Sequence, residues 1–207
     1  MILFGQPWQV PAVWLTVSLF AAVLSYFSCL WALKLARKSG MIALPGERQS
    51  HSRATPTGGG LGLIFSIVMT TVCLELIISL PVFWWQNMLP GVLLLTVVGW
   101  QDDRVPVSSF VRLIIQLVVS IWLIRFASLA LSLKDVFVFA VIILSMVWLM
   151  NVYNFMDGSN GMAGFQGVFA GMVTAALFQM NGQGEMALLA LSVAAACAGF
   201  LPGLPRR

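Results

Sequence analysis

The stretch VFVFAVIILSMVWLMNVYNFMDGSNGMAG, residues 136–164, places a long apolar run directly before a polar segment. The apolar run, residues 136–153, is close to the roughly 20 helical residues that cross a bilayer. It is continuous rather than alternating, which favours a helix over a strand of a membrane β-barrel. Polar side chains at membrane depth are costly unless they line a cavity or face a partner. The amides and carboxylate that follow the run therefore indicate a site at a helix end: Asn151, Asn154, Asp157 and Asn160.

The composition of the whole chain is that of a membrane protein. Of 207 residues, 60% are hydrophobic and 9% are charged, and the mean hydropathy is +0.96. These values lie far outside the range of water-soluble globular domains. Six further apolar runs can be placed at residues 11–33, 61–80, 83–99, 110–131, 162–180 and 186–201. We predict an all-α polytopic bundle of about seven transmembrane helices, organised as a single membrane domain over residues 1–207.

The distribution of basic residues predicts the orientation of the bundle. The first apolar run is too long for a signal peptide and has no basic residue before it, so we interpret it as a retained helix with its amino terminus outside. The loops near residues 34–59 and 100–112 and the tail at 202–207 then lie in the cytoplasm. They hold nine of the 11 Lys and Arg residues, as the positive-inside rule requires. The net charge of +4 follows from this bias and does not imply a nucleic-acid partner.

A pair of adjacent carboxylates, Asp102 and Asp103, lies just past the third predicted helix in GWQDDR. Two neighbouring carboxylates repel each other near a membrane, and a divalent cation would compensate them. Together with Asp157 and the amides they form an oxygen-rich set that suits Mg²⁺, with Mn²⁺ as the alternative ion. Zinc is disfavoured because the chain has one histidine. The competing interpretation is a solvated helix end, with Arg104 as the partner of the acidic pair.

The polar residues after the fifth apolar run have helical spacing. Asn151, Asn154 and Asp157 stand at i, i+3 and i+6, so a continuing helix would present them on one stripe. Gly158 and Gly161 would then break the helix. A glycine-capped helix end explains the glycines but not Asn151.

The first long loop contains RQSHSRATPTGGG, residues 48–60. Its glycines would let backbone N–H groups approach an anion at a helix start, and Arg48 and His51 could contact a phosphate or a nucleotide. It has neither the lysine of a P-loop nor a preceding strand, so neither nucleotide-binding fingerprint applies. A single histidine in a basic loop is more typical of a surface residue.

In combination the three loops resemble a known family. The patterns H-x-x-x-T-P-x-x-G-G at His51 to Gly60, D-D at Asp102 and Asp103, and N-x-x-N-x-x-D-G-x-x-G at Asn151 to Gly161 resemble the polyprenyl-phosphate N-acetylhexosamine-1-phosphate transferases (glycosyltransferase family 4). The resemblance is strongest to the bacterial members that initiate O-antigen and related surface glycans.

That resemblance implies a reaction and a location. Undecaprenyl phosphate would attack the sugar-bearing phosphorus of a UDP-N-acetylhexosamine at the cytoplasmic face of the bacterial inner membrane and release UMP. The fold would match the first two-thirds of a ten- to eleven-helix bundle, and a homodimer is possible. The alternatives are the related UDP-MurNAc-pentapeptide phosphotransferase of peptidoglycan synthesis and a non-catalytic or partner-binding membrane protein. A transporter is disfavoured, because its polar residues should lie near the bilayer midplane.

The resemblance also implies residue roles. Asp157 would bind Mg²⁺, and Asp102 and Asp103 would engage the metal or the lipid phosphate, one of them possibly accepting a proton. Asn151 and Asn154 would orient these groups. The remaining residues would contact substrate phosphate or nucleotide: Arg48, His51, Thr55, Gly59 and Asn160.

The chain departs from the family pattern in three ways. Asn160 stands where many members carry a second acid, and Ala54 and Thr57 replace frequent proline and arginine. Family members continue after a segment like GFLP into further loops that help hold the nucleotide sugar, whereas here GFLPGLPRR, residues 199–207, ends the sequence. We therefore expect a transferase that is incomplete at its carboxyl end, with little or no activity from the chain alone.

Two smaller features also carry predictions. A stripe of small residues, namely Ala163, Gly167, Gly171 and Ala175, favours helix packing within the bundle. Glu75 lies near the outer interface, where a snorkelling or locally paired acid is expected.

Overall fold

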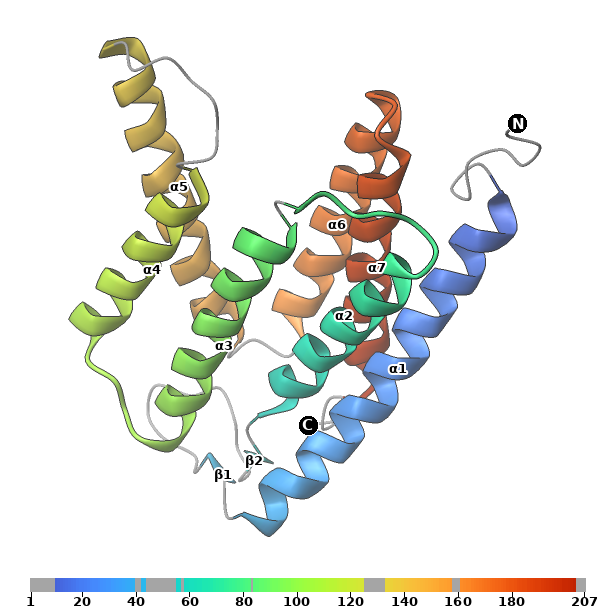
Figure 1. The fold of residues 1–207 in the computed structure, drawn as a ribbon. Coiled ribbons are helices and arrows are strands. Elements are labelled where there is room, and N and C mark those ends of the chain that lie inside the picture. Colours follow the sequence, from blue (N-terminus) through green and yellow to red (C-terminus); the bar gives the residue numbers. More distant parts are fainter. Residues whose placement is uncertain are drawn as a thin grey trace. The chain divides into compact units, whose positions relative to one another are not determined.

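The computed structural model describes residues 10–39, 42–43, 55–56, 58–82, 84–124, 133–157 and 161–203. Within these ranges the regular secondary structure is helical apart from two strands of two residues each, which confirms the predicted fold class (Figure 1). The helices lie close to the predicted runs: α1 Pro11–Lys38, α2 Gly59–Glu75, α3 Leu89–Arg104, α4 Ser109–Ile124, α5 Leu133–Asp157, α6 Met162–Met180 and α7 Gly184–Phe200. Shorter elements are β1 Ile42–Ala43, β2 Thr55–Pro56, the π-helical η2 Trp84–Met88 and the 3₁₀ turn η3 Leu201–Gly203.

Four segments of the described chain are long and apolar enough to cross a membrane: Pro11–Lys38, Asp135–Phe155, Met162–Met180 and Gly184–Gly203. Two further apolar helices, α2 and α4, are shorter. The protein is thus a multi-pass membrane protein, and its orientation stays a prediction.

Among the helix ends that differ from the predicted ones, two lie at acidic residues. Helix α3 continues to Arg104, so Asp102 and Asp103 lie in its last turn rather than beyond it. Helix α2 ends at Glu75, whose Oε2 atom accepts a hydrogen bond from the Leu80 N–H at 3.0 Å. This contact confirms that Glu75 is held locally.

The chain divides into two compact units. One comprises Met1–Leu80 and Ser159–Arg207, and we call it the α1/α7 unit; the other is Pro81–Gly158, the α3–α5 unit. The single domain predicted for residues 1–207 stays a prediction.

The α1/α7 unit is held together by close helix contacts at small residues. Helix α1 packs on α2 and α7, and α6 packs on α7 (Figure 1). A Cβ added at Gly62 would lie 2.6 Å from the backbone of Cys29, and one at Gly199 would overlap the carbonyl of Ala22. The Ser28 Oγ atom donates to the Gly62 carbonyl at 2.8 Å. Only glycine permits such approaches, which bring helix backbones almost into contact.

The predicted small-residue stripe on α6 packs inside this unit. A Cβ at Gly167 would lie 2.7 Å from the Cys197 Sγ atom, and one at Gly171 would lie 2.8 Å from the Ala194 Cβ atom. Ala175 is buried. The interpretation of the stripe as a packing surface is confirmed, and its partner is α7.

Strands β1 and β2 pair antiparallel, with Ala43 opposite Thr55 and Ile42 opposite Pro56. The two ends of the loop that carries Arg48 and His51 therefore lie side by side.

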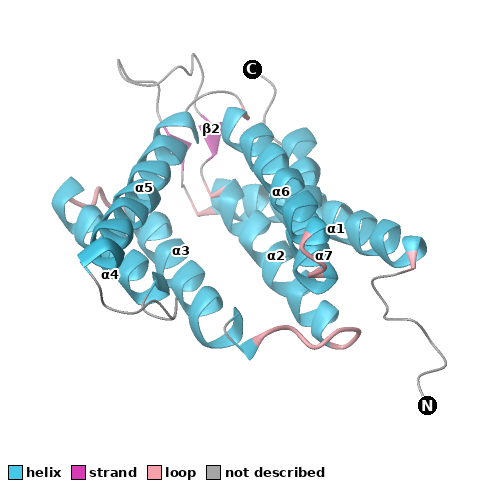
Figure 2. Ribbon diagram, turned by 90° about the horizontal axis from the view of Figure 1, so that it is seen from above, coloured by secondary structure: helices cyan, strands magenta, loops and turns pink. Residues whose placement is uncertain are grey.

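In the α3–α5 unit, α4 packs against both α3 and α5 (Figure 2). The short η2 packs on α3 and α4. Because α3 and α5 run antiparallel to α4, the carboxyl ends of α3 and α5 and the amino end of α4 meet at one end of the unit. That end carries the polar residues singled out above.

Candidate functional site

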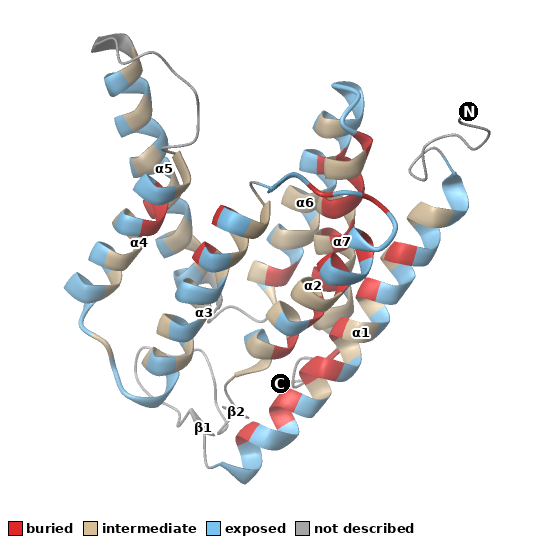
Figure 3. Cartoon of the chain, in the orientation of Figure 1, coloured by how far each residue is buried: buried red, intermediate tan, exposed pale blue. Residues whose placement is uncertain are grey.

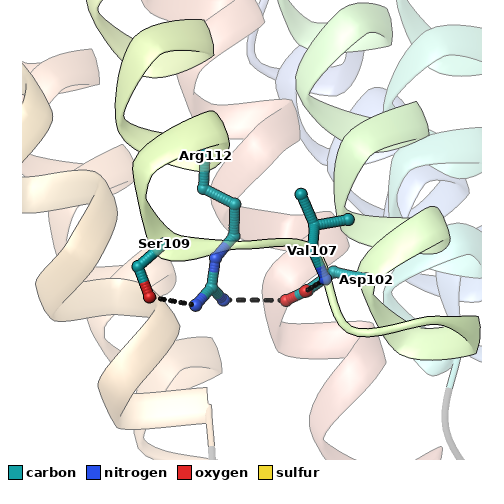
Figure 4. Close-up of polar contacts among 4 residues, drawn as sticks. All are labelled: Asp102, Val107, Ser109 and Arg112. Atoms are coloured by element: carbon teal, nitrogen blue, oxygen red, sulfur yellow. Dashed lines mark hydrogen bonds and ion pairs between the residues drawn. The ribbon is translucent and has the colours of Figure 1, made fainter.

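Both carboxylate oxygens of Asp102, in the α3–α5 unit, are held by hydrogen bonds. Its Oδ1 atom accepts a hydrogen bond from the Val107 N–H at 2.8 Å, and its Oδ2 atom pairs with the Arg112 Nη1 atom at 2.8 Å (Figure 4). The two side chains are 25% and 30% exposed. These contacts join the last turn of α3 to the first turn of α4 and fix the orientation of the carboxylate.

The partner of Asp102 is Arg112 and not Arg104. The Arg104 guanidinium carbon instead lies 3.8 Å from the centroid of the Trp100 ring, a cation–π stack one turn along α3. The sequence interpretation that placed Arg104 against the acidic pair is therefore wrong for Asp102. Residues i and i+4 on a helix are neighbours, whereas residues i and i+2 point apart, which explains why Arg104 meets Trp100.

Helix α4 also bonds to α5, one turn further along. The Asn151 Nδ2 atom donates to the Gln116 Oε1 atom at 2.7 Å and to the Val147 carbonyl at 2.8 Å. Arg112 and Gln116 stand at i and i+4, so one face of α4 connects the acid of α3 with the amide of α5.

A cavity of about 480 Å³ lies between α3, α4 and α5, within the range of small-molecule sites. Its walls are largely apolar, with side chains such as Leu95, Val98, Ile115, Leu149 and Met150. Its polar lining comprises Asp102, Arg112, Gln116, Tyr153 and Asn154. An apolar wall beside a cation and hydrogen-bonding groups is suited to an amphiphile with an anionic head. We call this cavity the α3–α5 pocket.

The structure brings together some of the predicted residues. Asp102 and Asn154 line the same pocket, and Asn151 is bonded to a residue that lines it. Helix α5 continues through Asp157, so the predicted stripe of Asn151, Asn154 and Asp157 is helical. Asp103 lies in the last turn of α3, next to Asp102.

The other predicted residues belong to the α1/α7 unit or lie outside the described residues. Gly59 begins α2 in the α1/α7 unit, close to Phe200 and Leu33, and Thr55 lies in β2. Arg48, His51 and Asn160, together with the side chain of Asp157, lie outside the described residues. Their predicted roles remain predictions.

The described residues contain no group of three or more His, Cys, Asp or Glu side chains that could hold a metal ion. The atoms around the pocket that could ligate a metal are nonetheless carboxylate and amide oxygens, which Mg²⁺ prefers and zinc does not. Both oxygens of Asp102 already accept a hydrogen bond, so Asp102 could ligate a metal only through its remaining lone pairs.

Sequence reasoning missed three polar residues of the pocket: Arg112, Gln116 and Tyr153. A signal was present for two of them. Arg112 and Gln116 are a charged and an amide side chain at helical spacing inside an apolar run, the same pattern that marked Asn151 and Asn154. In the sequence pattern, Arg112 counts only as a basic residue of a cytoplasmic loop, and Gln116 is part of the apolar run 110–131.

Comparison with known proteins identifies the family. The chain is 25% identical to a decaprenyl-phosphate N-acetylglucosaminephosphotransferase of Mycolicibacterium smegmatis, over 90% of this chain and 52% of the relative. It is 26% identical to a probable undecaprenyl-phosphate N-acetylglucosaminyl 1-phosphate transferase of Bacillus subtilis, over 81% of this chain and 49% of the relative. The chain thus spans about half the length of the curated relatives it matches, and no solved structure matches it significantly. The sequence model of glycosyl transferase family 4 matches residues 85–202, which include the entire α3–α5 pocket, and the protein belongs to that family.

Proposed function

We propose that the protein acts in the transfer of N-acetylhexosamine 1-phosphate from a UDP-sugar to undecaprenyl phosphate, with release of UMP. The observation that carries this proposal is the α3–α5 pocket, where Arg112, Asp102 and Asn154 border an apolar cavity. A membrane lipid with a phosphate head has this same division into apolar and anionic parts. The relatives are named for N-acetylglucosamine, which favours that hexosamine over the alternatives.

The reaction brings two anionic substrates together. A P–O bond forms between the lipid phosphate and the sugar-bearing phosphorus, and the P–O bond to UMP breaks, so negative charge develops on the leaving group. Catalysis of this kind depends on positioning and on neutralising charge. Arg112 supplies a fixed cation on the pocket wall, and Asp102 keeps its guanidinium in place.

Mg²⁺ is part of the proposal. When bound, it would screen the diphosphate and the leaving UMP. Asp157 would hold it, with Asp103 and Asp102 as the other acids and Asn154 as a neutral oxygen donor. Mn²⁺ has the same ligand preference and would substitute for it.

The site would lie at the cytoplasmic face of the inner membrane. The basic loops near α1, α3 and α4 support this orientation through the positive-inside rule. In that setting the product would be a lipid-linked sugar that initiates a surface glycan of the O-antigen type.

The test is a transfer assay in membranes that lack related transferases. Residues 1–207 are expressed alone and together with the carboxyl-terminal half of a relative, and label is followed from UDP-N-acetylglucosamine to undecaprenyl phosphate with and without Mg²⁺. We expect little or no transfer from the chain alone and Mg²⁺-dependent transfer from the pair.

The control variants are Asp157→Asn, which removes the proposed metal ligand, and Glu185→Gln, which makes the same change at the start of α7. We expect the first to abolish transfer and the second to leave it unchanged. Absence of label from the wild-type pair, with both parts inserted in the membrane, would refute the proposed reaction.

A further inference from the structure

The hydrogen bonds of Asn151 determine which way two amides face. The Val147 carbonyl can only accept, so the Asn151 atom at 2.8 Å from it is the nitrogen Nδ2. The second N–H of this nitrogen points to Gln116 at 2.7 Å. Gln116 must therefore present its oxygen, Oε1, to Asn151.

This orientation leaves the donor end of Gln116 available. Its Nε2 atom carries two N–H groups, and neither has an acceptor among the described residues. Gln116 is half-buried and lines the α3–α5 pocket. A ligand in the pocket that offers an oxygen atom can therefore accept a hydrogen bond from this amide.

Arg112 stands one turn before Gln116 and lines the same pocket. Two of its N–H groups donate hydrogen bonds, one to the Asp102 carboxylate at 2.8 Å and one to the Ser109 Oγ atom at the longer distance of 3.3 Å. A guanidinium has five N–H donors. The pocket-facing side of α4 therefore offers a cation and a neutral amide donor, a combination that matches a phosphate group.

We propose that Gln116 is a further substrate-binding residue, which donates from Nε2 to a phosphate oxygen of the ligand in the α3–α5 pocket. Asn151 is then the positioning residue that holds Gln116 in its donating orientation. This inference rests on the proposed function, which supplies the phosphate-bearing substrates. The phosphate could belong to the lipid or to the nucleotide sugar, and the test below separates the two.

Two substitutions separate donation from helix bracing. In Gln116→Glu, a carboxylate oxygen still accepts from Asn151, so the α4–α5 contact is kept while the donors are lost. In Asn151→Asp, the residue can no longer donate, so the Gln116 amide turns its nitrogen toward α5 and presents its oxygen to the pocket. Gln166→Glu on α6 is the matched control, because it makes the same change at an exposed residue outside the pocket.

The experiment measures binding to the purified chain in lipid nanodiscs. The probes are undecaprenyl phosphate, undecaprenol, which lacks the phosphate, and UDP-N-acetylglucosamine. We expect wild type to bind undecaprenyl phosphate more tightly than undecaprenol. Gln116→Glu and Asn151→Asp should weaken undecaprenyl phosphate binding by about 10-fold to 100-fold, the range for a hydrogen bond to a charged group. Undecaprenol binding, the thermal midpoint and the Gln166→Glu control should change little.

A loss confined to UDP-N-acetylglucosamine would support the donation and assign it to the diphosphate instead of the lipid. Equal weakening of undecaprenol and undecaprenyl phosphate would overturn the inference, because it would show a purely structural role. Unchanged binding in Gln116→Glu would overturn it as well, with the proposed function intact. If wild type bound neither phosphate-bearing probe, the proposed function would fail first and the inference with it.

Discussion

The two compact units join their helices by different means. In the α1/α7 unit, glycines and alanines bring helix backbones together, and the Ser28 hydroxyl of α1 donates to the Gly62 carbonyl of α2. In the α3–α5 unit, the links are pairs of polar side chains, Asp102 with Arg112 and Gln116 with Asn151. Burial differs as well: in an 18-residue apolar window of each helix, 56% of α7, 28% of α1 and 17% of α6 are buried, against 6% of α5 (Figure 3).

This difference indicates that the α1/α7 unit mainly provides stability and that the α3–α5 unit mainly provides the pocket. Small-residue packing excludes cavities and gains stability from dispersion contacts. Polar pairs hold helices further apart, leave room for a pocket and place hydrogen-bonding groups on its wall. We therefore expect substitutions in the α1/α7 unit to change mainly stability and those in the α3–α5 unit to change mainly activity.

The largest expected effect is that of Gly199→Val in the α1/α7 unit. Even the Cβ atom would overlap the Ala22 carbonyl, and overpacking against a backbone costs about 3 kcal/mol or more. In detergent, the variant should unfold at a much lower thermal midpoint than wild type, or show no cooperative unfolding transition. Gly60→Ala is the control, since nothing lies within 4 Å of a Cβ there. A normal midpoint for Gly199→Val would refute the close packing of α1 and α7.

The second expected effect is on activity. Asp102→Asn removes the charge that holds Arg112. We expect sugar-phosphate transfer by residues 1–207, co-expressed with the carboxyl-terminal half of a relative, to fall by about 100-fold, the scale of a lost positioning contact. Stability should change by at most about 1 kcal/mol, because the pair is partly exposed. Activity and thermal midpoint are measured on the same preparation. If Asp102→Asn greatly lowered the thermal midpoint but left transfer unchanged, the α3–α5 unit would contribute to stability rather than to activity, contrary to our expectation.

A smaller effect is expected for Ser28→Ala, which removes the hydrogen bond from α1 to the Gly62 carbonyl. The free energy of unfolding should fall by about 1 kcal/mol. Transfer by the chain co-expressed with the carboxyl-terminal half of a relative should be unchanged. Ser145→Ala on α5 is the comparison, because that hydroxyl is exposed and bonds only its own helix at Val141. Equal shifts of the two midpoints would argue against the α1–α2 hydrogen bond.

The smallest expected effect is that of Trp100→Leu. The cation–π stack with Arg104 lies at the end of α3, and such contacts contribute about 0.5–1 kcal/mol at exposed sites. We expect a slight fall in the thermal midpoint and transfer within about twofold of wild type. A loss of transfer as large as that of Asp102→Asn would place Arg104 in the site after all.

Much of the fold was predictable because it depends on local properties. The length of each apolar run determines whether it spans a bilayer, and the helical spacing of Asn151, Asn154 and Asp157 follows from the chain itself. The stripe on α6 was likewise predictable as a packing surface. The end of α3 could also have been predicted, because Pro106 restricts Val105 to an extended backbone and so ends the helix at Arg104, whereas Gly99 alone does not interrupt it.

The contacts of the site could not be derived in this way. Residue patterns along the chain were sufficient to predict the helices, the family and the polar residues at the helix ends. The pairing of Asp102 with Arg112, the contact of Gln116 with Asn151 and the approach of α7 to Ala22 became visible only once the helices were packed. The physical reason is that hydrophobicity and helical spacing act within one segment, whereas the rotation and depth of each helix depend on side chains distant in the sequence.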